Sequence, residues 1–162
     1  MSGLAEILLS RGFTVSGSDM KESPLTLHLG NLGAKINYGQ VASNITDDID
    51  LMVYTAAISP DNPEFMECKN RNIPMLSRAE LLGQLMKNYA TPIAISGTHG
   101  KTTTTSMVSE ILLGADKDPT LSIGGILKTI DGNLRIGRSD YFVTEACEYT
   151  NSYLSFFPKI SI

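Results

Sequence analysis

The chain has 162 residues, of which 42% are hydrophobic and 19% are charged, and its formal net charge is −4 at pH 7. This length and composition fit one ordinary domain or two small ones and exclude a chain that is disordered throughout. The acidic balance argues against nucleic-acid binding driven by net charge, because no cluster of Lys and Arg interrupts it.

Targeting and cysteine patterns indicate an intracellular protein. Apolar runs such as 51–54 are as long as a strand and far shorter than the roughly 20 residues that a bilayer requires. No basic region followed by an apolar region opens the chain, as it would in a secretory signal. Cys68 and Cys147 lack the spacing of a disulfide scaffold or a zinc site. We therefore expect a cytoplasmic protein with no membrane insertion and no nucleic-acid partner, of unknown oligomeric state.

Short apolar runs alternate with helical patterns in the first half of the chain, which is typical of an α/β fold with a parallel sheet. Apolar residues at three- and four-residue spacing predict a first helix that ends at Gly12. Ser23 and Pro24 are typical of a helix start. The further elements predicted here are strands at 13–17, 34–37, 50–55 and 73–76, and helices at 23–33, from 62 onward and at 77–86.

The alternation restarts after residues 89–91, which we predict to be a linker between a domain at 1–88 and a domain at 89–162. The chain begins on a helix without a preceding strand and stops inside an apolar run, so we expect a segment of a longer protein. The second half is predicted to contain a strand at 93–96, a glycine-rich turn, a helix that ends at 113, and strands at 120–123, 134–136, 141–144 and 159–162.

The strongest motif is Gly97-Thr98-His99-Gly100-Lys101-Thr102-Thr103, which lies between a predicted strand and a predicted helix. Glycines let a backbone approach phosphates, and the N–H groups at the start of a helix attract anions. Lys101 would provide a positive charge for the β- and γ-phosphates, and the Thr102 hydroxyl would bind Mg²⁺. The usual eight-residue pattern has a further glycine where this chain has Ile95, so the loop is a shortened variant. The alternative is a glycine-rich turn that merely caps a helix.

Carboxylates follow a later strand. Glu145 and Glu148 flank Cys147 directly after the strand predicted at 141–144. Ligand groups gather at the carboxyl ends of parallel strands, and a cation that bridges phosphates takes one or two carboxylates there. Glu145 is therefore a candidate Mg²⁺ ligand, although an acidic residue at a strand end can also be a plain solvated group. Cys147 is interpreted as a small buried residue beside the site.

Two further positions face the same kind of crevice. Asp19 stands where dinucleotide-binding folds place an acid on a ribose hydroxyl, and Thr55-Ala56-Ala57 follows the clearest buried strand. Each also fits an ordinary turn. His99 lies inside the glycine-rich loop, where contact with a bound ligand is the favoured interpretation.

Several segments follow one another along nearly the whole chain in the order seen in one known family. They are 1–5, 17–19, 53–58, 62–64, 78–83, 96–105 and 145–149. Together they resemble the Mur ligase family of peptidoglycan synthesis. The resemblance implies a Rossmann-like UDP-binding domain whose first strand is missing, followed by the front part of a P-loop-type ATP-binding α/β domain.

The function implied by this resemblance is an ATP-dependent ligase that joins L-alanine to the lactyl carboxylate of UDP-N-acetylmuramate through an acyl phosphate. The cofactors implied are ATP and Mg²⁺. By the same resemblance the ATP-binding residues are Gly97, Thr98, His99, Gly100, Lys101, Thr102 and Thr103. The implied catalytic residues are Lys101 and His99, the Mg²⁺ ligands are Thr102 and Glu145, and the UDP-sugar contacts are Asp19, Thr55, Ala56 and Ala57.

Other functions remain open at this point. A sister ligase would attach a whole peptide to the same sugar. A nucleotide-binding remnant would bind without turnover. An unrelated P-loop kinase is disfavoured by the α/β pattern that precedes the loop and resembles a UDP-sugar domain.

Overall fold

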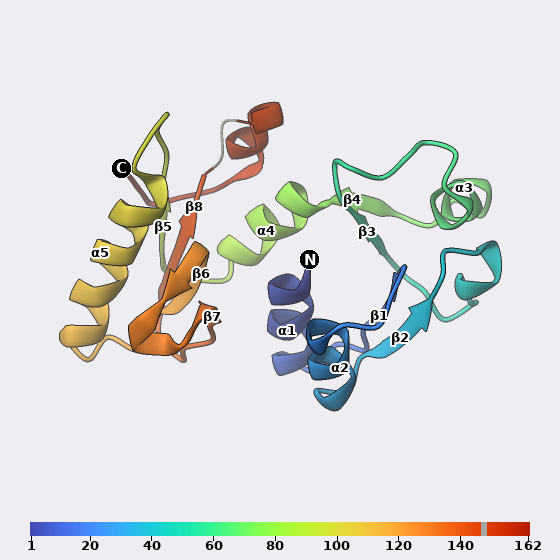
Figure 1. Ribbon diagram of the computed structural model, residues 1–162. Helices are drawn as coiled ribbons and strands as arrows, with labels where there is room; N and C mark the ends of the chain where they lie inside the picture. The colour runs from blue at the N-terminus through green and yellow to red at the C-terminus, as the bar shows by residue number, and fades with distance from the viewer. Residues whose placement is uncertain (147–148) are drawn as a thin grey trace. The chain divides into compact units, whose positions relative to one another are not determined.

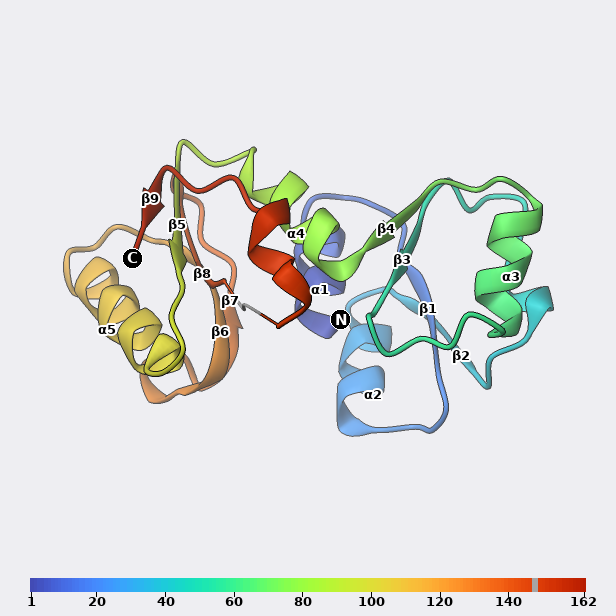
Figure 2. The ribbon, with the colours of Figure 1, turned by 90° about the horizontal axis from the view of Figure 1, so that it is seen from above.

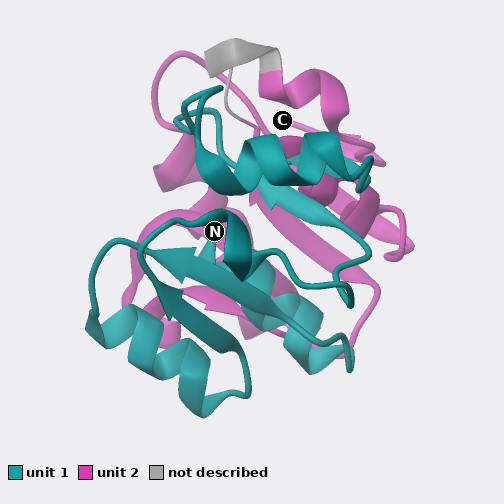
Figure 3. Cartoon of the chain, turned by 90° about the vertical axis from the view of Figure 1, so that its right-hand side faces the viewer, with its two compact units in different colours: residues 1–78 teal, residues 79–162 magenta. Residues whose placement is uncertain are grey.

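The computed structural model describes residues 1–146 and 149–162, except for the side chains of 149–151. The chain divides into two compact units, Met1–Arg78 (unit 1) and Ala79–Ile162 (unit 2) (Figure 3). The division falls at the start of helix α4 (Arg78–Met86), whereas the sequence places a domain boundary between residues 88 and 89. The assignment of one function to each domain stays a prediction.

Unit 1 holds two separate parallel sheets of two strands each, in which β1 pairs with β2 and β3 pairs with β4. Helices α1 and α2 lie side by side on one side of these strands, and α3 lies on the other (Figures 1 and 2). The elements are α1 (Ser2–Ser10), β1 (Ser16–Asp19), α2 (Pro24–Asn31), β2 (Lys35–Tyr38), η1 (Ala42–Asn44), β3 (Met52–Tyr54), α3 (Pro63–Asn70) and β4 (Met75–Ser77).

The predicted helix starts of unit 1 are confirmed by their caps. The Ser23 hydroxyl accepts the N–H of Thr26 at 3.2 Å, and the Thr26 hydroxyl accepts the N–H of Ser23 at 2.9 Å. The Asn62 side chain accepts the N–H groups of Glu64 and Phe65 at 3.0 and 3.2 Å. Both caps satisfy N–H groups that have no acceptor within the helix.

The first strand begins later than predicted. The sequence favours a strand at 13–17, but β1 begins at Ser16. The N–H of Phe13 donates to the carbonyl of Leu8 at 3.1 Å, so residue 13 still closes the end of α1. Pairing with β2 begins only where Ser16 lies opposite Lys35.

Unit 2 contains a five-stranded sheet in the order β7-β6-β8-β5-β9. All neighbours are parallel except β6 and β7, which are antiparallel. Helix α5 lies against one side of the sheet, and α4 and η3 lie on the other (Figures 1 and 2). The remaining elements are β5 (Thr91–Ile95), α5 (Lys101–Gly114), β6 (Thr120–Leu127), η2 (Lys128–Ile130), β7 (Gly132–Arg135), β8 (Tyr141–Glu145), η3 (Tyr149–Ser155) and β9 (Ile160–Ser161).

Strand β6 is longer than the sequence indicates. The prediction ends it at 123, whereas the strand continues through Gly124 and Gly125 to Leu127. Its antiparallel partner β7 accounts for the extension, because Leu127 pairs with Gly132 at the far end of the hairpin. No helix in the described part of the chain is long and apolar enough to cross a membrane.

The core of unit 2 lies on both sides of the sheet, and one cluster of it is covered by α5. Buried aliphatic side chains of β5, β6 and β8 pack against Val108, Leu112 and Leu113 of the helix. Phe142, which precedes Val143 of this cluster on β8, faces the other side of the sheet, because successive side chains of a strand alternate. It has no exposed surface, and its ring lies 4.9 Å from the ring of Tyr89, centroid to centroid. Apolar burial on this scale holds the strands that carry the loop in place.

Phe142→Ala should lower the free energy of unfolding of unit 2 by about 3–5 kcal/mol, because it leaves a cavity in a fully buried position. Urea denaturation followed by circular dichroism measures the change. Ile126→Ala is the control, since Ile126 lies on β6 and is 80% exposed; it should change the stability by no more than about 0.5 kcal/mol. Equal losses in the two variants would contradict the burial of Phe142 in the core.

Asp118 provides a pH-dependent contact in unit 2. Its carboxylate accepts the N–H of Arg138 at 2.9 Å and the guanidinium of Arg135 at 2.6 Å. These contacts, the Arg138 N–H first, hold the pKa of Asp118 below its usual value. A carboxyl group with a lowered pKa in the folded state stabilises the fold above its unfolded pKa of about 3.9, and this contribution is lost as the pH falls through the folded pKa.

Asp118→Asn should therefore reduce the loss of stability of unit 2 on acidification below about pH 4, the unfolded pKa range of Asp. Denaturant unfolding at a series of pH values measures the slope. Asn tolerates the left-handed backbone at this position, where φ is +48°. Asp116→Asn, at φ +53° in the same unit, controls for the backbone conformation. An unaltered slope in Asp118→Asn would show that these contacts do not stabilise the fold.

Candidate functional site

The glycine-rich loop, residues 96–100, joins a buried strand to an exposed helix start. Residues 92–95 of β5 are buried, and all five loop residues are exposed. Gly100 caps α5 with φ +78° and ψ 2°, a left-handed conformation that glycine adopts without strain. The first N–H groups of an α-helix have no acceptor within the helix, and they point along its axis toward the loop. The predicted strand–loop–helix unit is thus confirmed, and it has the geometry of an anion cradle.

Lys101 closes the loop on itself. Its Nζ donates to the carbonyl of Gly97 at 2.6 Å, so the ammonium lies over the loop backbone. The Lys101 carbonyl in turn accepts the hydroxyl of Thr105 at 2.8 Å, and Thr105 is fully buried. The first turn of α5 is thereby anchored to the interior, while the charge of Lys101 remains at the mouth of the loop.

Glu145 reaches the same place from the neighbouring strand. Strands β5 and β8 are parallel, and Ile95 lies opposite Glu145. Both residues therefore end at one edge of the sheet. Glu145 Oε2 accepts the hydroxyl of Thr102 at 3.2 Å, and its Oε1 accepts the backbone N–H of Gly124 at 2.7 Å. The predicted pair, Thr102 and Glu145, is brought together.

The spacing of these two side chains fits a magnesium ion. Mg²⁺ binds oxygen at 2.0–2.1 Å in octahedral geometry, which places neighbouring ligand oxygens about 2.9 Å apart. The 3.2 Å between the Thr102 hydroxyl and the Glu145 carboxylate is close to that value. Within the described residues no group of three or more His, Cys, Asp and Glu could hold a metal. The pair therefore provides two oxygen ligands of the kind that Mg²⁺ prefers.

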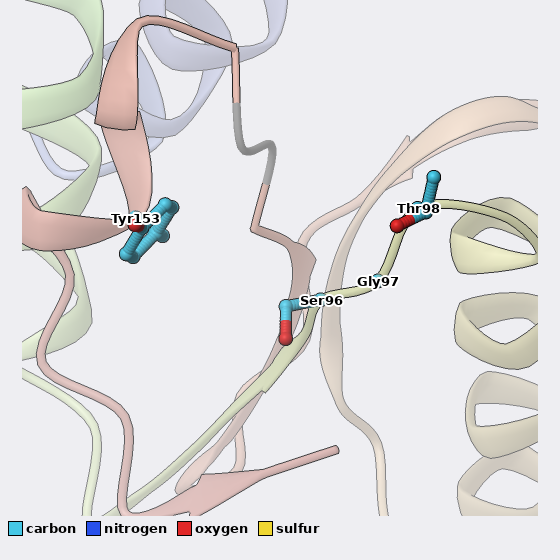
Figure 4. A pocket seen from close by; sticks show the side chains of 4 residues that line it. All are labelled: Ser96, Gly97, Thr98 and Tyr153. Atoms are coloured by element: carbon cyan, nitrogen blue, oxygen red, sulfur yellow. The ribbon is translucent and has the colours of Figure 1, made fainter.

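A shallow pocket of about 220 Å³ lies beside the loop. Its lining comes from Ser96, Gly97 and Thr98 of the loop and from Tyr153 of η3 (Figure 4). Tyr153 lies in no recognised sequence motif, and only the return of the chain through η3 brings it to the loop. Its ring provides an apolar wall opposite the polar loop.

The other predicted residues of this site are exposed on and after the loop. His99 is exposed on the loop, and Thr98 and Thr103 are exposed on either side of Gly100. Cys147 and Glu148 lie outside the described residues.

The predicted UDP-sugar residues stand at the carboxyl ends of strands in unit 1. Asp19 ends β1, where its carboxylate accepts the N–H of Lys21 at 3.3 Å. Thr55 follows β3, and its carbonyl accepts the N–H of Ile58 at 3.2 Å, which places Ala56 and Ala57 in a turn. The two positions belong to different sheets. Their role in binding stays a prediction.

Sequence reasoning missed a buried carboxylate close to these turns. Glu64 is 7% exposed and accepts the Ser18 hydroxyl and the Asn44 side-chain amide, each at 2.6 Å. In the sequence Glu64 marks only the start of a helix. In the structure it ties β1, η1 and α3 together beside Asp19.

A phosphate-cradling loop between a parallel strand and a helix, with a carboxylate on the adjacent strand, is the arrangement of P-loop-type nucleotide-binding α/β proteins. Residues 1–90 match the model of the Mur ligase family, catalytic domain. The chain belongs to the Mur ligase family.

Individual relatives agree with this assignment. The chain is 66% identical to a UDP-N-acetylmuramate–L-alanine ligase of Agathobacter rectalis, over the whole chain and 35% of that relative. The crystal structure of UDP-N-acetylmuramate-alanine ligase from Thermotoga maritima is similar with a TM-score of 0.87 and 33% identity, covering 99% of this chain and 37% of that one. The chain spans about a third of the length of the curated relatives it matches, 35% in the first of them.

A third similarity is to a peptide-adding enzyme. The structure of UDP-N-acetylmuramate:L-alanyl-gamma-D-glutamyl-meso-diaminopimelate ligase from Neisseria meningitides has a TM-score of 0.88 and 28% identity to this chain. The match covers 99% of this chain and 55% of that one. The backbone of these residues therefore does not distinguish the two kinds of ligase.

Lys101→Ala should weaken binding of Mg·ATP by about 10- to 100-fold, because it removes a charge-assisted contact to phosphate. Isothermal titration calorimetry with the full chain measures the affinity. Lys117→Ala is the matched control, since Lys117 is exposed in the turn beyond the far end of α5; this variant should bind as the wild type does. Unchanged affinity in Lys101→Ala would refute the assignment of the loop.

Proposed function

We propose that this chain is the nucleotide-binding portion of an ATP-dependent ligase that joins L-alanine to the lactyl carboxylate of UDP-N-acetylmuramate in peptidoglycan precursor synthesis. The observation that carries the proposal is the convergence of the loop 96–100, Lys101 and Glu145 at one sheet edge. The 66% identity to an L-alanine ligase supports the choice of amino acid.

The chemistry explains why such a site suffices for activation. A carboxylate is a poor electrophile because its negative charge is delocalised. One of its oxygens attacks the γ-phosphorus of ATP, and the bond to the β-phosphate oxygen breaks to release ADP. The amine of L-alanine then attacks the acyl carbon, loses a proton and displaces inorganic phosphate, leaving an amide. Transfer of the phosphoryl group requires positioning and charge neutralisation more than a nucleophilic side chain.

The residues of this chain divide those tasks among them. The N–H groups at the start of α5 would bind the phosphates, and Lys101 would leave the Gly97 carbonyl to neutralise the β- and γ-phosphates. Thr102 and Glu145 would hold Mg²⁺, which when bound supplies charge to the phosphate oxygens. His99, exposed on the loop, would contact the γ-phosphate and the substrate carboxylate. In unit 1, Asp19 and residues 55–57 would face the UDP-sugar.

The second candidate is a ligase that adds a peptide to the same sugar. Its support is the TM-score of 0.88 to the Neisseria peptide ligase, which equals that to the alanine ligase within 0.01. Both candidates share the ATP and UDP-sugar substrates and differ only in the amine.

The chain is expected to bind Mg·ATP in calorimetry. In the whole ligase, phosphate release should require ATP, UDP-N-acetylmuramate and L-alanine together, and mass spectrometry should find the amide. Replacing L-alanine by the tripeptide named for the Neisseria enzyme should abolish product. Product from the tripeptide alone would favour the second candidate. Nucleotide binding without phosphate release under either condition would contradict both candidates.

A further inference from the structure

A pair of adjacent glycines, Gly124 and Gly125, lies in the interior of β6 beside the candidate metal ligands. Glycine weakens a strand interior, because it has no side chain to pack and loses more backbone entropy than other residues. Such a position often marks a close approach by another group. Here each glycine has its own neighbour, and the two neighbours are Glu145 and Thr102.

Gly124 adjoins the carboxylate of Glu145. A Cβ atom on Gly124 would lie 2.7 Å from Oε2 and 2.9 Å from Oε1 of that carboxylate, closer than real Cβ atoms come. The backbone N–H of Gly124 donates to Oε1 at 2.7 Å. The same residue therefore attracts the carboxylate with its N–H and makes room for it by lacking a side chain.

Gly125 makes room for the other ligand. A Cβ atom on this residue would lie 3.0 Å from Cγ2 of Thr102, a contact that the threonine could relieve only by shifting. The Thr102 hydroxyl is the group that donates to Glu145 Oε2 at 3.2 Å. A shift of Thr102 would therefore alter the distance that matches neighbouring ligands of an octahedral ion.

We propose that Gly124 and Gly125 are positioning residues that set the Glu145 carboxylate and the Thr102 hydroxyl at the separation a divalent cation requires. The inference rests on the proposed function, in which these two side chains hold Mg²⁺ with ATP. The two glycines lie outside the loop motif, on β6. In this role each glycine acts through the side chain that it adjoins.

The atoms around Gly124 indicate that its substitution should disturb the metal ligand rather than the fold. The atoms that a methyl group on Gly124 would meet belong to the far end of a flexible side chain, which can turn away. Gly124→Ala should therefore fold, with the carboxylate displaced. Gly132 offers a matched control in the same sheet, because its Cβ would meet only backbone oxygens and a nitrogen at 3.7 Å or more.

The test compares the affinity of the full chain for ATP with Mg²⁺ and with EDTA, by isothermal titration calorimetry. The dissociation constant in EDTA divided by that in Mg²⁺ measures how much the cation strengthens ATP binding. Gly124→Ala should reduce this ratio by about 10-fold or more, the usual effect of losing a partner that orients a metal ligand. Gly125→Ala should reduce it in the same direction, and Gly132→Ala should leave it unchanged. Binding in EDTA and the melting temperature should be similar in all these variants.

A double variant of Gly124 and Glu145 distinguishes a positioning role of Gly124 from a general structural effect. Glu145→Gln removes the anionic ligand, so adding Gly124→Ala to it should cause no further loss of the ratio. A structural role for Gly124 would produce the same additional loss in both backgrounds.

The outcomes separate the two proposals. A wild-type chain without a Mg²⁺-dependent gain in ATP affinity contradicts the proposed function and this inference with it. A wild-type gain that Gly124→Ala preserves, or losses that add independently of Glu145→Gln, overturn the inference alone and leave the proposed function standing.

Discussion

The parallel pairing of β5 with β8 is the constraint on which the candidate site depends. It places Ile95 opposite Glu145, so the loop that follows one residue and the carboxylate of the other emerge at the same sheet edge. Parallel pairing is possible because the chain between the strands forms α5 and β6 before it returns. A shift of one residue in this register would turn Glu145 to the other face of the sheet and away from Thr102.

The site is already ordered by its own hydrogen bonds. Lys101 is held by the loop carbonyl of Gly97, and Glu145 is held by Thr102 and Gly124. These contacts come from the loop, α5, β6 and β8, so four separate segments define one small region. Such preorganisation lowers the cost of arranging charged groups when a ligand arrives. Binding of phosphate would replace the contact of Lys101 with a stronger ionic one.

Unit 1 is built on weaker pairing than unit 2. Its strands form two separate pairs, whereas unit 2 has one sheet of five strands. Side-chain contacts compensate in part, above all the buried Glu64, which links β1 to α3 and to Asn44 of η1. This carboxylate lies beside the end of β1, where Asp19 is expected to face the UDP-sugar. The end of β1 is therefore held at Ser18 by a side chain distant in sequence.

The sequence alone determined the α/β class, the loop with Lys101 and Thr102, and the family, because these depend on local periodicity and on short motifs. It also pointed to Glu145, since an acid after a buried strand has a known place in parallel sheets. Only the tertiary structure decided the partners of that carboxylate, the wall that Tyr153 forms beside the loop, and the close approach at Gly124 and Gly125. These contacts join residues far apart in the chain, and local propensity contains no information about which distant segments meet.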